Sequence, residues 1–397
     1  MNTQQIELLK SVDLALFDTP FISRDSIDCV TLIEEAIDQT VVGLTVTTVK
    51  KYAADHFVPN LDQWNSLSDQ IEAYYVWSFQ AQRDLIKLFE DNGIPMVILK
   101  GNAAAVYYPV PKRRTMGDID FLVPRDRFDE AQSLMEQSGY KRTSSSHDEE
   151  SRHIGYSKNG VVFELHRSFS SFGIDIDSEL ENGLLHPDSG VIAGISFPML
   201  PPLENGLVLL LHIRQHLMEE AYSLGLRQVI DWMMYVNRYS GSELEGGVVW
   251  DDAFMSLAQK YGLDTLAITV TYICKTWIGL PNYPVWCEKA DQATAEELLE
   301  MIMESGNFGS KLEKDNRSVK QGITWYKQEG VFKRLQSRGM ANWKAAQKYR
   351  VLRPFAWMYQ GCRVIGLGMK SLFSSKNGVR QISEGNRKSD LLKRLGV

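Results

Sequence analysis

Hydrophobic residues recur every three or four positions over much of the first 92 residues, which is the spacing of one face of an α-helix. The pattern is clearest over residues 31–37 and 67–89. The second stretch ends at Asn92-Gly93, and these two residue types commonly terminate helices. We therefore predict a helical N-terminal region over residues 1–92.

Between residues 93 and 200 the hydrophobic residues gather in short runs rich in β-branched and aromatic side chains, which favours strands. Asn159-Gly160 separates two of these runs and predicts a hairpin turn. We expect strands over residues 94–99, 117–123, 153–156 and 161–166, helices over residues 102–108 and 128–138, and a polar loop over residues 143–150.

The consecutive prolines Pro201 and Pro202 mark a boundary, because proline interrupts regular structure. Helical periodicity returns over residues 204–237, 250–280 and 293–303, and the stretch 305–309 interrupts it. The whole pattern predicts an α+β protein. Its parts would be the helical region 1–92, a core 93–200 with a small mixed sheet and flanking helices, and a helical C-terminal domain 201–397 with a basic tail.

The chain has 397 residues, more than one ordinary compact core accommodates, which indicates two or three units. Its net charge of −7 argues against extensive wrapping of nucleic acid. The four cysteines lack Cys-x-x-Cys spacing, which favours reduced thiols in a cytoplasmic protein over disulfides or a zinc site. We expect no secretory signal and no transmembrane segment, since no hydrophobic run approaches the roughly 20 residues that span a bilayer.

Basic residues outnumber acidic ones from residue 334 onward. These charges could contact RNA or another anionic surface, but their dispersion is more typical of a solvated helical face with a disordered end. Nucleic acid is therefore not the favoured partner. The basic residues concerned are Arg350, Arg353, Arg363, Lys370, Lys376, Arg380, Arg387, Lys388, Lys393 and Arg394.

Two aspartates, Asp118 and Asp120, stand inside the hydrophobic run 117–123. Residues i and i+2 of a strand project from the same face, so the two carboxylates would lie side by side. Asp-x-Asp sequences are common, and most of them lie in turns or on solvated faces and do not mark a metal site. Here the surroundings favour a divalent cation, because burying unpaired carboxylates costs several kcal/mol.

Four features around these aspartates match a known pattern, namely Leu99-Lys100-Gly101, Tyr108-Pro109, Arg114 and Asp118 to Val123. The arrangement resembles the DNA polymerase β-like nucleotidyltransferase superfamily, and more closely a bacterial family known as uncharacterised nucleotidyltransferases. The resemblance implies a polymerase β-like core and a third carboxylate on a later strand.

Glu164, in the hydrophobic run 161–166, is the candidate for the third carboxylate. Such a residue needs compensation in an apolar strand; the alternative is a salt-bridged or exposed glutamate on an edge strand. His166 projects on the same face, and the similar family has an acidic residue and a histidine at this interval. For nucleotidyl transfer with two Mg²⁺ or Mn²⁺ ions, we assign Asp118 and Asp120 to bridge the ions and Glu164 to complete the catalytic site on the side of the acceptor.

The turn after the first core strand is the candidate nucleotide-binding segment. Gly101 and Asn102 would offer backbone N–H groups to the β- and γ-phosphates at the start of a short helix. Lys100 and Arg114 are the nearest cations for the departing pyrophosphate, although Lys100 could instead point behind the strand. The similar superfamily commonly has serine after the glycine, where this chain has Asn102.

The helical segment 204–237 carries two pairs of polar residues one turn apart. His212 and His216 lack the glutamate of a metalloprotease motif, which favours packing or contact with an acceptor. Arg227 and Asp231 fit an ion pair along the helix, although the similar family often has His, Arg and Asp in this part.

These features predict a Mg²⁺-dependent enzyme that transfers a nucleoside monophosphate from an NTP, such as ATP, to a hydroxyl group and releases pyrophosphate. The alternative is a nucleotide-binding sensor or scaffold without turnover. Three mutually repelling carboxylates favour the enzyme. The acceptor stays open between a small molecule, a sugar, a protein side chain and an RNA end, and the oligomeric state stays open as well.

Overall fold

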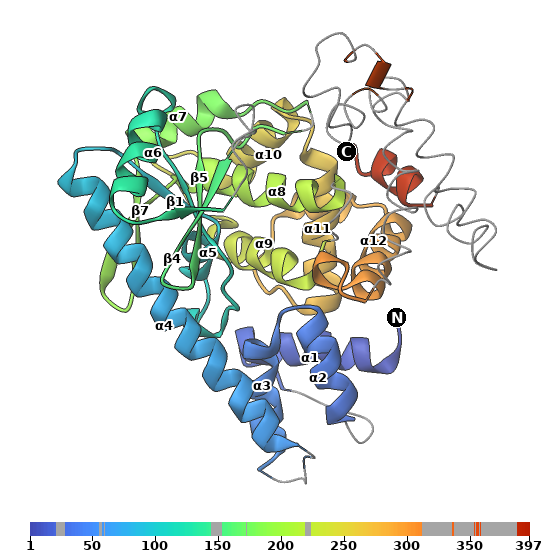
Figure 1. Ribbon diagram of the computed structural model, residues 1–397. Helices are drawn as coiled ribbons and strands as arrows, with labels where there is room; N and C mark the ends of the chain where they lie inside the picture. The colour runs from blue at the N-terminus through green and yellow to red at the C-terminus, as the bar shows by residue number, and fades with distance from the viewer. Residues whose placement is uncertain are drawn as a thin grey trace.

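The computed structural model is organised around a seven-stranded mixed sheet with helices on both faces (Figure 1). The strand order is β3-β4-β5-β2-β1-β7-β6. The strands are β1 (Val97–Leu99), β2 (Ile119–Leu122), β3 (Lys141–Arg142), β4 (His153–Lys158), β5 (Val161–His166), β6 (Asp188–Ile192) and β7 (Ile195–Met199). The structure describes residues 1–20, 28–54, 58, 60–143, 153–171, 173–218, 224–311, 336, 353, 355–356, 358 and 387–397.

The centre of the sheet joins strands that are distant in sequence. β2 runs antiparallel to β1 and parallel to β5, while β7 pairs in parallel with the other side of β1. β4 and β5 form the predicted hairpin. Its turn residues Asn159 and Gly160 both have positive φ angles, of 49° and 76°, as a type I′ turn requires.

One face of the sheet is covered by α4 (Leu61–Asp91) and α6 (Phe128–Gln137). Phe121 of β2 and Phe163 of β5 belong to the hydrophobic cluster on this side. Phe89 of α4 meets Phe121 edge to face, with ring centroids 5.4 Å apart. Because side chains alternate along a strand, the acidic residues of β2 and β5 project from the opposite face.

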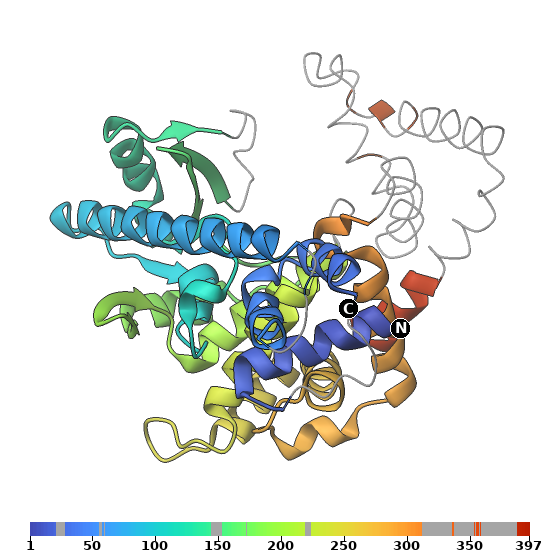
Figure 2. The same ribbon diagram turned by 90° about the horizontal axis from the view of Figure 1, so that it is seen from below.

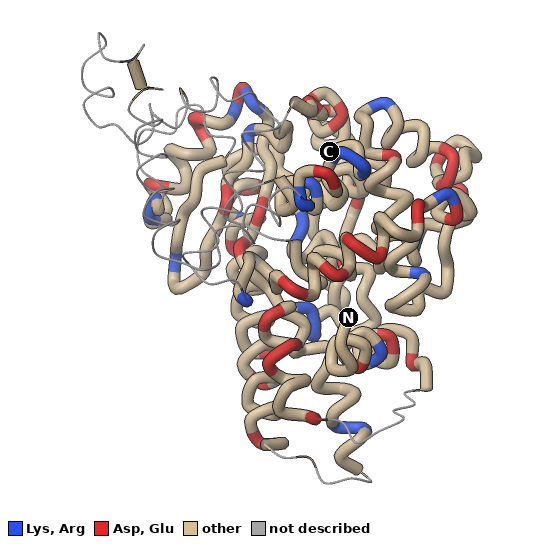
Figure 3. The backbone as a smooth tube through the Cα atoms, turned by 90° about the vertical axis from the view of Figure 1, so that its right-hand side faces the viewer, with Lys and Arg blue, Asp and Glu red and all other residues tan. Residues whose placement is uncertain are grey.

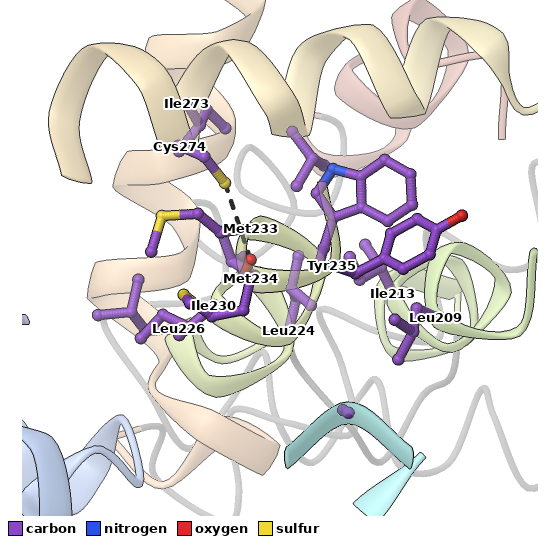
Figure 4. Close-up of a cluster of buried hydrophobic side chains, with 14 of the residues drawn as sticks. Leu209, Ile213, Leu224, Leu226, Ile230, Met233, Met234, Tyr235, Ile273 and Cys274 are labelled. Atoms are coloured by element: carbon purple, nitrogen blue, oxygen red, sulfur yellow. Dashed lines mark hydrogen bonds between the residues drawn. The ribbon is translucent and has the colours of Figure 1, made fainter. Parts of the chain in front are cut away.

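That opposite face is covered by two helices with three more behind them. They are α8 (Pro202–Met218), α9 (Leu226–Tyr239), α10 (Trp250–Lys260), α11 (Asp264–Ile273) and α12 (Gln292–Ser305). Leu209 and Ile213 of α8 lie beside Tyr235 of α9 in a buried hydrophobic cluster that also contains Ile230 (Figure 4). This packing fixes the position of α8 relative to α9, and polar residues of both helices face the sheet.

The three N-terminal helices lie against the C-terminal ones (Figure 2). They are α1 (Thr3–Phe17), α2 (Cys29–Asp38) and α3 (Val42–Tyr52). Gln39, fully buried after α2, donates to the Ile302 carbonyl at 2.9 Å and accepts from the Leu226 N–H at 2.9 Å. Its amide therefore ties the N-terminal helices to α9 and α12. The domain boundaries stay a prediction.

A helix over residues 387–394 ends the chain. Leu391, Leu392 and Leu395 are buried in the same core as the C-terminal helices. Arg387 and Arg394 both pair with Glu297 of α12, so acidic and basic segments lie together near the C-terminus (Figure 3). Arg353, Lys388 and Lys393 are also described; Arg350, Arg363, Lys370, Lys376 and Arg380 lie outside the described residues.

The α+β class and most predicted elements are confirmed. Four details differ: β1 begins only at Val97, the first helix of the core is α5 (Gly101–Ala105), and residues 204–237 and 250–280 each contain two α-helices, the second stretch ending in a short π-helix (Cys274–Ile278). The hairpin of β6 and β7 and the short β3 were not predicted. Most of the expected loop at residues 143–150 lies outside the described residues. Among the described helices, none combines the length and apolar character needed to cross a membrane.

Candidate active site

Three carboxylates meet where β2 and β5 run side by side. Asp118 directly precedes β2, Asp120 lies within it, and Asp120 is paired in register with Glu164 of β5. One carboxylate oxygen from each residue lies within 4.8 Å of the others. The structure thus brings together the three acidic residues singled out from the sequence.

Two cationic side chains reach Asp120, which is only 2% exposed. The Lys100 ammonium lies 2.6 Å from Asp120 Oδ1, and His166 Nε2 lies 2.9 Å from the same oxygen. Lys100 therefore points into the carboxylate cluster and not behind the strand. Its expected contact with departing pyrophosphate is at odds with this placement, because the ammonium is already paired with Asp120.

These contacts set the ionisation of the cluster. Burial alone would raise the pKa of Glu164, but the hydrogen bond from His166 and the charge of Lys100 outweigh it and lower that pKa to about 2. Burial would lower the pKa of His166, but its hydrogen bonds to Asp120 and Glu164 raise it. Glu164 is consequently ionised at neutral pH and stays available to a cation.

His153 is a site residue that the sequence reasoning missed. Its Nε2 lies 3.6 Å from Glu164 Oε1, and it is directly opposite His166 in the hairpin. Counting back from the Asn159-Gly160 turn would have paired these two histidines. Gly117, Ser168, Phe169 and Gln215 also line the cavity and were not predicted.

Helices α8 and α9 form the opposite wall of a cavity of about 240 Å³. His212, His216 and Arg227 line it together with the carboxylates. The Nε2 atoms of the two histidines lie 2.9 Å apart. Burial, and then the charge of Lys100, hold the pKa of His212 well below its usual value, so its imidazole is neutral at physiological pH.

Arg227 faces the cavity without the partner expected for it. Asp231 instead accepts two hydrogen bonds from Arg114, at 2.7 and 2.6 Å, and one from the Tyr108 hydroxyl at 2.7 Å. The expected ion pair between Arg227 and Asp231 is therefore wrong. Arg227 donates to the Thr115 carbonyl at 3.3 Å, and no carboxylate among the described residues forms an ion pair with it. Burial, and then the nearby Arg114 charge, lower its pKa.

The side chains of Arg114 and Asn102 form buried contacts with other parts of the protein. The bidentate pair with Asp231 occupies the guanidinium of Arg114, which is 5% exposed. Arg114 also lines the cavity, and its role with pyrophosphate stays a prediction. The Asn102 side chain is also buried and donates to Gln82 of α4 at 2.8 Å, away from the residues that line the cavity. Gly101 does line it, with a φ of 33°. Phosphate binding by the backbone of Gly101 and Asn102 stays a prediction.

The carboxylate cluster fits a divalent cation. Mg²⁺ and Mn²⁺ favour carboxylate oxygens, which Asp118, Asp120 and Glu164 supply from one face of two adjacent strands. Arg227 of the facing helix α9, which forms no ion pair with any described carboxylate, adds a place for an anion. Together these features are typical of enzymes that transfer phosphorus-containing groups.

The chain belongs to the family of uncharacterised nucleotidyltransferases, whose model matches residues 25–279. It is therefore an enzyme of the nucleotidyltransferase class.

Solved structures show distant likenesses. One is the solution structure of the antibiotic-resistance factor ANT(2'')-Ia, with 10% identity, a TM-score of 0.33, and 47% of this chain and 94% of that chain covered. Another is an antigenic nucleotidyltransferase-like protein from Paracoccidioides brasiliensis, with 17% identity, a TM-score of 0.29, and 49% and 89% covered. No curated protein matches the chain. The family match is what defines the class.

Proposed function

We propose that the protein transfers a nucleoside monophosphate from an NTP to a hydroxyl-bearing acceptor in a reaction that depends on Mg²⁺ or Mn²⁺ and releases pyrophosphate. The observation that carries this proposal is the approach of Asp118, Asp120 and Glu164 to within 4.8 Å in one cavity. Membership in the nucleotidyltransferase family supports the transfer of a nucleotidyl group in general.

The three carboxylates would hold the divalent cation, which when bound neutralises phosphate oxygens and activates the attacking hydroxyl. Arg227 would bind phosphate oxygens of the NTP, because its guanidinium lies in the cavity and pairs with no described carboxylate. Gly101 lines the cavity where its backbone N–H could approach the same phosphates. Positioning of the triphosphate between β2 and α9 would account for much of the catalysis.

His212 would contact the acceptor. It lines the cavity from α8, and its neutral imidazole can accept a hydrogen bond from a hydroxyl group. His216, at 2.9 Å, would hold the ring in place.

The proposal is tested by incubating the full chain with each labelled NTP, Mg²⁺ or Mn²⁺ and candidate acceptors, and by measuring pyrophosphate release. Asp118→Asn and Asp120→Asn are each expected to slow release at least about 100-fold, because a lost metal ligand removes several kcal/mol of charge stabilisation. Asp129→Asn, an exposed residue of α6, is the matched control and should leave the rate unchanged.

Release that persists in the double variant Asp118→Asn/Asp120→Asn would contradict the catalytic assignment. Calorimetry distinguishes the enzyme from the second candidate function. Nucleotide binding by the unaltered protein without any product would indicate the sensor or scaffold.

A further inference from the structure

We propose that His153, Glu164 and His166 form a second metal site, which takes a transition-metal dication such as Zn²⁺ or Co²⁺ beside the Asp118 and Asp120 carboxylates. This site goes beyond the proposed nucleotidyl transfer and does not require it. It belongs to the hairpin of β4 and β5, and only Glu164 is shared with the carboxylate cluster.

The spacing of the donor atoms carries the proposal. His153 Nε2 lies 3.6 Å from Glu164 Oε1, and His166 Nε2 lies 3.4 Å from Glu164 Oε2. One ligand atom from each of the three residues lies within 4.8 Å of the others. Ligand atoms around a tetrahedral Zn²⁺, bonded at about 2.0–2.1 Å, are about 3.4 Å apart. Small side-chain rotations would therefore bring all three onto one ion.

The donor types select a different ion from the one proposed for the aspartates. Two imidazoles and one carboxylate suit Zn²⁺ and Co²⁺, whereas Mg²⁺ favours an all-oxygen set. Two histidines with one glutamate, and a fourth position left open, form a ligand set known from catalytic zinc sites. The side chains of His153 and Glu164 are 38% and 24% exposed, so the fourth position would face solvent.

The surrounding structure holds these ligands in place. His153 and His166 are directly paired across the hairpin, and their ring centroids are 5.0 Å apart. The His166 ring also contacts Phe169, at 5.6 Å between centroids, and is 5% exposed. Metal binding would replace the contact of His166 with Asp120, while Lys100 would keep its own pairing with that aspartate at 2.6 Å.

The test uses the full chain, freed of metal by a chelator and titrated with Co²⁺ alone. We expect one Co²⁺ per chain with the strong visible absorption of a tetrahedral ion, displacement of that ion by Zn²⁺, and no displacement by Mg²⁺. His153→Ala should weaken Co²⁺ binding at least about 10-fold and remove the tetrahedral absorption, since it deletes one of three ligands. His186→Ala, an exposed histidine after α7 (Asp177–Leu185), is the control and should behave as the unaltered protein.

The proposal fails if His153→Ala, shown by its unfolding midpoint to be folded, binds Co²⁺ with unchanged affinity and absorption. It also fails if Asp118→Asn abolishes the absorption while His153→Ala keeps it, because the ion would then belong to the carboxylate cluster. A tetrahedral Co²⁺ signal that depends on His153 in a protein without nucleotidyl transfer would uphold this site and refute the proposed function alone.

Discussion

Lys100 shows how single residues balance the charge of the site. Its φ of 46° and ψ of −137° are unusual for a residue with a side chain, and such conformations cost about 1–3 kcal/mol. Burial would lower its pKa, but Asp120 and Glu164 raise it, so the ammonium stays charged. Lys100 thereby neutralises part of the carboxylate cluster, which would otherwise destabilise the fold.

At the same scale, Arg227→Met tests how the triphosphate is bound. Loss of hydrogen bonds between a charged donor and phosphate removes about 1.5–3 kcal/mol, so we expect the Kd for NTP to rise about 10- to 100-fold. Calorimetry with a non-hydrolysable NTP measures this directly. Arg238→Met, at an exposed position of the same helix, is the control, and equal affinities of the two variants would contradict the role of Arg227.

At the scale of elements, one buried ion pair anchors the segment that connects β1 with β2 to helix α9. Arg114 of this connection binds both carboxylate oxygens of Asp231, and both residues are at most 5% exposed. The connection begins at Lys100 and ends at Asp118, so its anchoring also determines where these two site residues lie.

Arg114→Met is expected to lower the free energy of unfolding by about 3–5 kcal/mol, because Asp231 is left buried without its ionic partner. Denaturant unfolding followed by circular dichroism provides the measurement. Lys112→Met, which removes a surface pair with Glu72, should change it by less than about 1 kcal/mol. Similar losses of unfolding free energy in both variants would show that the Arg114 pair does not stabilise the fold through its burial.

At the scale of the whole molecule, both ends of the chain enter the core formed by the C-terminal helices. Leu8 and Val12 of α1 and Leu392 near the C-terminus belong to one buried cluster with α8, α9 and α11. Arg387 and Arg394 meet Glu297 on the surface of this assembly. The terminal helix over residues 387–394 is thus a structural element of the fold.

Leu392→Ala should lower the free energy of unfolding by about 2–5 kcal/mol, as expected for a fully buried leucine. Arg394→Ala should lower it by less than about 1 kcal/mol, because its pair with Glu297 is partly exposed. Unfolding in urea compares the two variants. A larger effect for Arg394→Ala would mean that the ion pairs, and not the leucines, hold the terminal helix.

The sequence by itself determined the features that depend on local spacing. Alternation along each strand predicted that Asp118 and Asp120 project from one face of their strand, and that Glu164 and His166 likewise project from one face of theirs, because successive side chains of a strand point to opposite sides. The Asn159-Gly160 turn predicted the hairpin for an equally local reason. The resemblance to the nucleotidyltransferase family also rested on a short stretch, and the family match confirms it.

Only the tertiary structure decided the partners of these residues. Asp231 pairs with Arg114, which lies 117 positions away, and not with Arg227 one turn along the helix, because the buried bidentate geometry forms between β1–β2 and α9. The strand order likewise placed β5 beside β2 and joined the acidic groups. Such contacts depend on how distant elements pack, so they cannot be predicted from the spacing of residues within one segment.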